Sequence, residues 1–121
     1  MSRATVNTRY VRHFNVVYCE PYSAGSLTSI FSTIMDWMFA RSTPSFPQPI
    51  QAMKADIVAH TITIFEKTVD TFRPTPAKGH YSYNLRDIAK VFQGISKSSS
   101  KAIKKEDDMV KLWAHECARV F

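Results

Sequence analysis

Apolar residues recur every three or four positions along most of this 121-residue chain, which is the spacing of one face of an α-helix. The repeat predicts four main helices, at about residues 26–41, 50–72, 84–95 and 107–121. The side chains expected to be buried are Leu27, Ile30, Phe31, Ile34 and Met38; Met53, Ile57, Val58, Ile62, Phe65, Val69 and Phe72; Leu85, Ile88, Val91, Phe92 and Ile95; and Met109, Leu112 or Trp113, Cys117 and Val120. The pattern therefore predicts a mainly α fold.

Helix boundaries are marked by proline, by capping residues and by polar segments. Proline-rich stretches follow the first and second predicted helices, and proline supplies no amide donor to continue a helix. Asn84 is expected to cap the third helix by accepting a hydrogen bond from the amide of Asp87, whose carboxylate favours the positive helix end. The segment rich in serine and lysine from Ser96 to Lys105 is predicted to be a solvated surface loop.

One short β-strand is predicted ahead of the helices, from Phe14 to Cys19, because this stretch is rich in β-branched and aromatic residues. Pro21 ends it. A single strand leaves its backbone groups unpaired, so it requires partner strands that the rest of the chain does not supply. The last helix runs to Phe121 without a glycine stop. Both features indicate a piece of a larger protein.

The composition argues against a disordered chain and against a membrane-spanning one, but it does not indicate a particular function. Hydrophobic residues make up 45% of the chain, which argues against global disorder, and no apolar run is long enough to span a membrane. The net charge of +6 fits a nucleic-acid or acidic partner, but it also fits local bias in a fragment. Cys19 and Cys117 are far apart in the sequence and are expected to be free thiols.

No catalytic or metal-binding motif is complete in the chain. Gly25, Gly79 and Gly94 are isolated, so no Walker A loop of the form GxxxxGK[ST] is present. Asp107 and Asp108 follow a lysine-rich stretch rather than an apolar strand, so they do not match the magnesium-binding carboxylates of a Walker B motif. The four histidines lack the spacing of zinc ligands. We therefore expect no enzyme activity from this chain alone, and neither metal nor cofactor bound to it.

Three arginines remain as candidates for phosphate binding. Arg9 and Arg12 lie just before the predicted strand, where a short helix or turn would project one of them outward. Arg86 lies in the first turn of the third predicted helix, where free amides and a guanidinium together favour phosphate. The alternative for Arg86 is an ion pair with a nearby carboxylate of the same domain. The sequence does not choose between these roles.

Several blocks of sequence, taken in order, resemble an AAA+ module of a dynein heavy chain. Residues 9–17, RYVRHFNVV, look like the end of the large subdomain, and residues 74–87, PTPAKGHYSYNLRD, look like the segment that leads into the sensor helix of the lid. Residues 91–95, VFQGI, and 112–121, LWAHECARVF, complete the match. The best match is the third module of the ring. The motifs NLRD, at residues 84–87, and VFQG, at residues 91–94, resemble the corresponding motifs of axonemal heavy chains.

The resemblance implies a division of the chain and a role for each arginine. Residues 1–22 would be the C-terminal end of the AAA+ large α/β subdomain, and residues 23–121 the helical lid subdomain. Arg86 falls on the position of the sensor-2 arginine, which would reach the γ-phosphate of the module's own nucleotide. Arg9 falls on the position of the arginine finger, with Arg12 as second choice, and would serve the neighbouring module. ATP or ADP with Mg²⁺ would bind to the parent protein.

The implied function is that of a lid that closes over ATP or ADP in a motor ATPase. It would transmit nucleotide state round the ring and drive microtubule-based movement in the axoneme of a cilium or flagellum. The implied partners are the preceding α/β subdomain, neighbouring AAA+ modules, other dynein subunits and microtubules, with no nucleic acid or membrane. Two alternatives remain: a structural docking module, and a free-standing helical domain that binds nucleic acid. The latter would use four lysines, Lys97, Lys101, Lys104 and Lys105.

Overall fold

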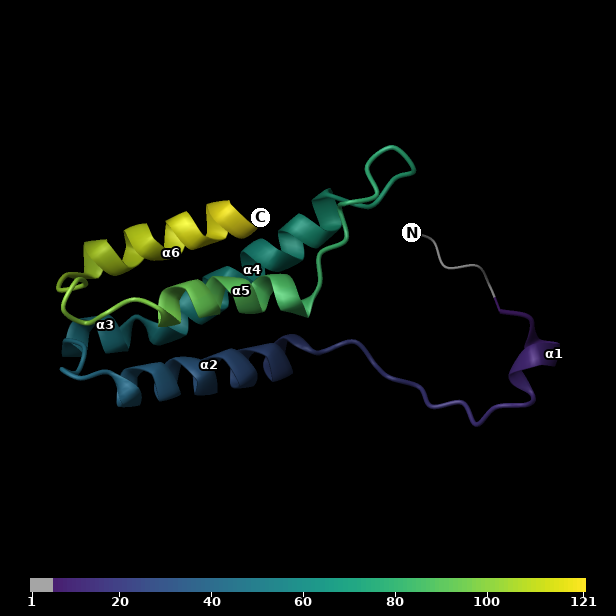
Figure 1. Ribbon diagram of the computed structural model, residues 1–121, viewed down its shortest axis with the longest axis horizontal. Helices are drawn as coiled ribbons and strands as arrows, with labels where there is room; N and C mark the ends of the chain where they lie inside the picture. The colour runs from purple at the N-terminus through teal and green to yellow at the C-terminus, as the bar shows by residue number, and fades with distance from the viewer. Residues whose placement is uncertain (1–5) are drawn as a thin grey trace.

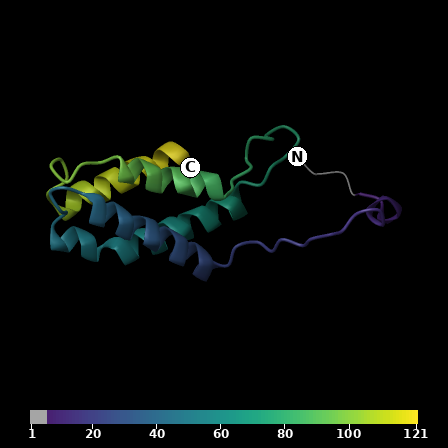
Figure 2. The ribbon, with the colours of Figure 1, turned by 60° about the horizontal axis from the view of Figure 1, so that its bottom comes forward.

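The computed structural model describes residues 6–121 as a bundle of helices with a separate N-terminal segment (Figure 1). The elements are α1 (Thr8–Val11), α2 (Ala24–Arg41), α3 (Gln48–Ala52), α4 (Lys54–Thr71), α5 (Leu85–Ser96) and α6 (Glu106–Val120). Within the bundle α5 packs on α6 and α2 packs on α4, and the contact between α2 and α5 joins the two pairs (Figure 2). The predicted mainly α fold is confirmed. None of the helices in residues 6–121 has the length and apolarity needed to cross a membrane.

The core is formed by large apolar side chains that face the bundle axis. Phe31 of α2 stacks on Phe92 of α5 with ring centroids 4.4 Å apart, and both are almost fully buried. Burial of each such ring stabilises the fold by about 1.5–3 kcal/mol. The remaining buried apolar residues are Leu27, Met35, Met38, Phe39, Phe46, Ile50, Ile57, Val58, Ile62, Ile88, Val91, Ile95, Ile103, Met109 and Cys117. The core therefore draws on α2 to α6 and on the loops that join them.

The second predicted helix is in fact two helices, because Met53 interrupts it between α3 and α4. Its predicted apolar face is also partly wrong, since Val69 and Phe72 are exposed while Thr61 is fully buried. Thr61 can be buried because its hydroxyl group both donates and accepts a hydrogen bond. It donates to the carbonyl of Ile57 at 2.6 Å and accepts from the indole nitrogen of a tryptophan on α6 at 2.8 Å.

The predicted apolar face of the first helix is also partly wrong, although Leu27, Phe31 and Met38 are buried as predicted. Met35 and Phe39 of α2 are buried, whereas Ile30 is 38% exposed. Met35 and Phe39 are buried in addition because α2 contacts both α4 and α5, so its covered face is wider than the stripe of residues three and four apart. The segment from Ser96 to Lys105 is less solvated than predicted, because Ser100 and Ile103 are buried within it.

The predicted strand from Phe14 to Cys19 is not formed. This stretch has no regular secondary structure, and Val16, Val17 and Tyr18 are between 71% and 83% exposed. Within residues 6–121 the β-pairing consists of an isolated bridge between Thr75 and Lys78. The physical reason is that residues 6–121 contain no neighbouring strand with which this segment could exchange backbone hydrogen bonds. The segment consequently extends away from the bundle in both views (Figures 1 and 2).

Candidate functional site

The start of α5 is held by a reciprocal cap. Asn84 Oδ1 accepts a hydrogen bond from the amide of Arg86 at 2.8 Å, and Asp87 Oδ2 accepts from the amide of Asn84 at 3.0 Å. The Asn84 side chain also accepts from the amide of Asp87, as predicted, which completes a capping box, and the Asp87 amide lies 2.9 Å from the Asn84 carbonyl as well. These bonds satisfy free donors of the first turn and fix the backbone from which the Arg86 side chain projects.

Arg86 is exposed, and no carboxylate binds it in the described part of the chain. The adjacent carboxylate of Asp87 is occupied by Lys90, with Nζ and Oδ1 2.9 Å apart. Burial by itself raises the pKa of Asp87, but the hydrogen bonds from Lys90 and from the Asn84 amide, with the charge of Lys90, bring it below its usual value. The carboxylate is thus ionised and already paired. The Arg86 guanidinium is left free to meet a ligand.

Aromatic rings hold this end of the bundle together. Tyr83, immediately before the cap, meets Phe121 edge-on with ring centroids 6.2 Å apart, and Phe121 lies 6.3 Å from Phe65 of α4. Tyr81 contacts Phe72 at 5.3 Å. The start of α5 is therefore tied to the ends of α4 and α6. Sequence reasoning missed these contacts, and the only hint of them was the alternation of tyrosines just ahead of the cap.

Arg9 and Arg12 lie on the N-terminal segment. The amide of Arg9 donates to Asn7 Oδ1 at 2.9 Å, which caps the short helix α1, and Arg12 Nε donates to His13 Nε2 at 3.3 Å. Both arginines are exposed. Because this segment lies apart from the bundle in both views, the structure does not bring Arg9 or Arg12 together with Arg86 (Figures 1 and 2).

The remaining candidate groups do not form a reactive centre. No cluster of three or more metal-ligating side chains occurs in residues 6–121. Cys19 is exposed, whereas Cys117 is buried. Burial, and then the charge of Glu116, raise the pKa of the Cys117 thiol to about 11. The four lysines of the predicted nucleic-acid loop are all exposed and follow the C-terminal end of α5, which is the opposite end from Arg86.

Comparison with known proteins places these features in a family. AAA+ lid domains match residues 57–121, a stretch that includes most of α4, all of α5 and α6, and Arg86. Over 98% of its length the chain is 36% identical to dynein axonemal heavy chain 12 of Rattus norvegicus and 34% identical to dynein axonemal heavy chain 3 of Homo sapiens. Over 97% of its length it is 35% identical to the ciliary dynein beta chain of Heliocidaris crassispina. It spans only 3% to 4% of the length of these relatives. The chain belongs to the family of AAA+ lid domains.

Proposed function

We propose that this chain is the lid of an AAA+ module in an axonemal dynein heavy chain, and that Arg86 senses the nucleotide bound to that module. The observation that carries the proposal is the exposed guanidinium of Arg86 on the capped start of α5, without a carboxylate partner among residues 6–121. A guanidinium in this setting binds phosphate oxygens bidentately. It also stabilises negative charge during phosphoryl transfer.

The chain would contribute one wall of the nucleotide site. ATP or ADP with Mg²⁺ would be held by the preceding α/β subdomain, which carries the Walker residues of the parent protein. The role of the lid is to bring Arg86 to the γ-phosphate. Because α5 shares a buried core with α2 and α6, a force on Arg86 would displace the bundle as a unit. Loss of the γ-phosphate would release this contact and change the orientation of the lid.

Residues 1–22 would be the end of the large α/β subdomain. The exposed, extended backbone after α1 is available to pair with a neighbouring sheet, and it would then form the strand that the sequence predicts. Arg9 would act as the arginine finger of the adjacent module's site, with Arg12 as the second choice. Their separation from Arg86 fits service to two different nucleotides.

In the parent protein the lid would transmit nucleotide state round the ring of a microtubule motor ATPase, and we place it in the third module. Its partners would be the preceding subdomain and neighbouring AAA+ modules, together with other dynein subunits and microtubules. The names of the relatives, axonemal and ciliary dynein heavy chains, support a location in the axoneme of a cilium or flagellum.

The test uses a motor domain that carries this lid. We expect Arg86→Ala to weaken the nucleotide response about 10- to 100-fold, because a charge-assisted hydrogen bond of about 1.5–3 kcal/mol is lost. Lys111→Ala, which removes an exposed positive charge from α6, is the matched control and should leave the response unchanged. Equal nucleotide dependence in Arg86→Ala and the control would refute the sensor role. Arg9→Ala should instead slow turnover at the neighbouring site without weakening binding at this one.

A further inference from the structure

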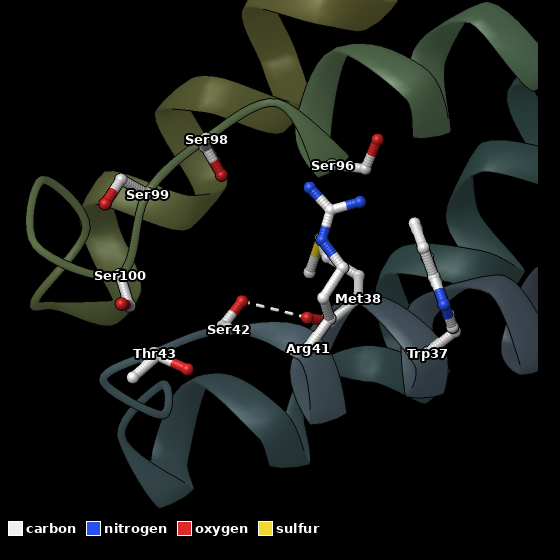
Figure 3. Close-up of a pocket in the computed structure, with 9 residues that line it drawn as sticks. All are labelled: Trp37, Met38, Arg41, Ser42, Thr43, Ser96, Ser98, Ser99 and Ser100. Carbon is white, nitrogen blue, oxygen red and sulfur yellow. Dashed lines mark hydrogen bonds between the residues drawn. The ribbon is translucent and has the colours of Figure 1, made fainter.

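The two ends of α5 are held in different ways. At the C-terminal end, the last residue of α5 and the loop after it border a pocket of about 210 Å³ that faces the end of α2 (Figure 3). A hydrogen bond from Ser100 Oγ to the carbonyl of Pro44, at 2.5 Å, joins the loop to the α2 side. At the N-terminal end, which carries Arg86, the contacts are made by aromatic rings. The first turn of α5 therefore depends on ring packing for its position relative to the other helices.

Tyr83 lies between the two aromatic contacts that reach this turn. On one side its ring meets the ring of Phe121 edge-on, with centroids 6.2 Å apart. On the other side it stacks on Tyr81, with centroids 6.5 Å apart and ring planes 16° apart. Each partner has a further ring contact, since the centroid of Phe121 lies 6.3 Å from that of Phe65 and the centroid of Tyr81 lies 5.3 Å from that of Phe72. The ring of Tyr83 is therefore held from both sides.

The backbone of Tyr83 is part of the cap of α5. A peptide bond is planar, so the carbonyl group of Tyr83 and the amide of Asn84 move together. That amide donates to Asp87 Oδ2 at 3.0 Å, which is one half of the capping box. The Asn84 side chain in turn accepts from the amides of Arg86 and Asp87. Rotation of the backbone at Tyr83 would turn the Asn84 amide away from its carboxylate and loosen the turn that carries Arg86.

The loop ahead of Tyr83 does not hold the cap by itself. Between α4 and α5 the backbone projects beyond the bundle (Figure 1), and its β-pairing within the described residues is the isolated bridge between Thr75 and Lys78. After the cap, Ile88 is fully buried and sets the rotation of α5 about its axis. Ile88 does not set the direction of the chain ahead of Asn84. That direction is set where Tyr83 packs between its two neighbours.

We propose that Tyr83 is the positioning residue of Arg86. Its ring holds the peptide that closes the capping box, and the capping box holds the turn from which the exposed guanidinium projects. The inference rests on the proposed nucleotide-sensing role of Arg86 and adds the side chain that keeps the sensor in place. The hydroxyl group of Tyr83 is not needed for this task, because the ring makes the contacts with Phe121 and Tyr81.

Phe121 would link the end of α6 to this position. Its amide donates to the carbonyl of Cys117 at 2.9 Å, so its ring moves with the last turn of α6. A displacement of that turn would shift the Tyr83 ring and, through the cap, the direction of Arg86. The end of α6 is thus the place at which a movement elsewhere in the parent protein would change the sensor.

The first experiment measures hydrogen exchange of the Arg86 amide in the 121-residue chain by NMR. Tyr83→Ala should raise the exchange rate about 2- to 10-fold, which is the change in population that the loss of one aromatic pair produces. Phe121→Ala should also raise it, and the double variant should raise it no further than Tyr83→Ala alone. Tyr83→Phe, which keeps the ring, should behave like the wild type. An unchanged rate in Tyr83→Ala, or a raised rate in Tyr83→Phe, would overturn the proposal.

Val91→Ala is the control for a general loss of stability. It removes a fully buried side chain from the middle of α5, so it lowers the melting temperature. The Arg86 amide exchanges through opening of the first turn, so its rate should stay close to that of the wild type. An increase as large as that in Tyr83→Ala would show that the rings only stabilise the bundle, and the positioning role would be lost.

The second experiment uses a motor domain that carries this lid and measures the nucleotide concentration that gives a half-maximal response. Tyr83→Ala should raise that concentration about 2- to 10-fold, Tyr83→Phe should restore the wild-type value, and Tyr83→Ala should add nothing in the Arg86→Ala background. A loss that persists in the Arg86→Ala background would show that Tyr83 does not act through the arginine. If Arg86→Ala alone has no effect, the sensing role fails, and amide exchange in the chain still decides whether Tyr83 holds the turn.

Discussion

We expect the substitution Gly94→Ala to destabilise the folded chain, because the added methyl group would clash with a buried side chain. Gly94 lies in the third turn of α5, where this helix faces α6. A Cβ added there would overlap Cδ and Oε2 of Glu116 and lie 2.8 Å from its Cγ. Glu116 is only 8% exposed, and its Oε2 binds Arg119 Nη2 at 2.5 Å. The added methyl group therefore forces a confined side chain to move.

The magnitude follows from two opposing effects. Alanine is a better helix former than glycine by about 1 kcal/mol, which alone would stabilise α5. Overpacking of an interface typically costs about 1–3 kcal/mol. Displacement of Glu116 also breaks its pair with Arg119, but that pair is half-exposed and contributes about 1 kcal/mol or less. We expect a net loss of about 1–2 kcal/mol, because Glu116 is buried and held by Arg119.

The assay is urea unfolding followed by circular dichroism, carried out as a double-mutant cycle with Glu116→Ala. In the Glu116→Ala background the methyl group no longer meets the carboxylate, so Gly94→Ala should stabilise the chain by about 0.5–1 kcal/mol. The effect of one substitution thus changes sign between two backgrounds. Stabilisation in the wild-type background, or an equal loss in both backgrounds, would refute the reasoning.

Two further predictions concern ionisable side chains. At pH 8 an alkylating reagent should modify Cys19 rapidly and leave Cys117 unmodified in the folded chain, because the Cys117 pKa is raised to about 11. Asp87 has a lowered pKa in the fold, so its contribution to stability is present above its unfolded pKa of about 3.9 and is lost as the pH falls through the folded value. Stability measured by urea unfolding should therefore decline more steeply on acidification in the wild type than in Asp87→Asn.

Each of these has its own control. For the cysteines, the control is the chain unfolded in an assay buffer that contains 8 M urea, where both thiols should be alkylated at the same rate. Equal alkylation rates of the two thiols in the folded chain would contradict the argument that Cys117 is protected by burial. For the carboxylate, Asp56→Asn removes an exposed acidic residue from α4 and should leave the acid dependence of stability unchanged. Parallel pH profiles for the wild type and Asp87→Asn would show that the pair with Lys90 contributes nothing measurable.

The features that could be predicted from the sequence are those with local causes. Helix period, proline breaks and capping depend on residues within a few positions of one another, which is why α2, α5 and α6 begin and end within two residues of their predicted bounds. Arg86 could be named for the same reason, since its place in a first turn is set by Asn84. Whether its guanidinium is available could not be predicted, because that depends on which carboxylates of other helices lie near it, and none binds it within residues 6–121.

Only the tertiary structure decided which faces are covered. Met35 is buried because α2 meets two helices at once, whereas Ile30 lies outside the covered face, and spacing along one helix does not specify the positions of its neighbours. Thr61 can be buried because Trp113, 52 positions away, donates to its hydroxyl. The residues from Phe14 to Cys19 have strand composition but no strand, since the hydrogen bonds of a β-strand come from another strand. Interactions between residues close in the sequence determine where the helices form. Contacts between distant segments determine which faces of these helices are buried and which side chains stay exposed to ligands.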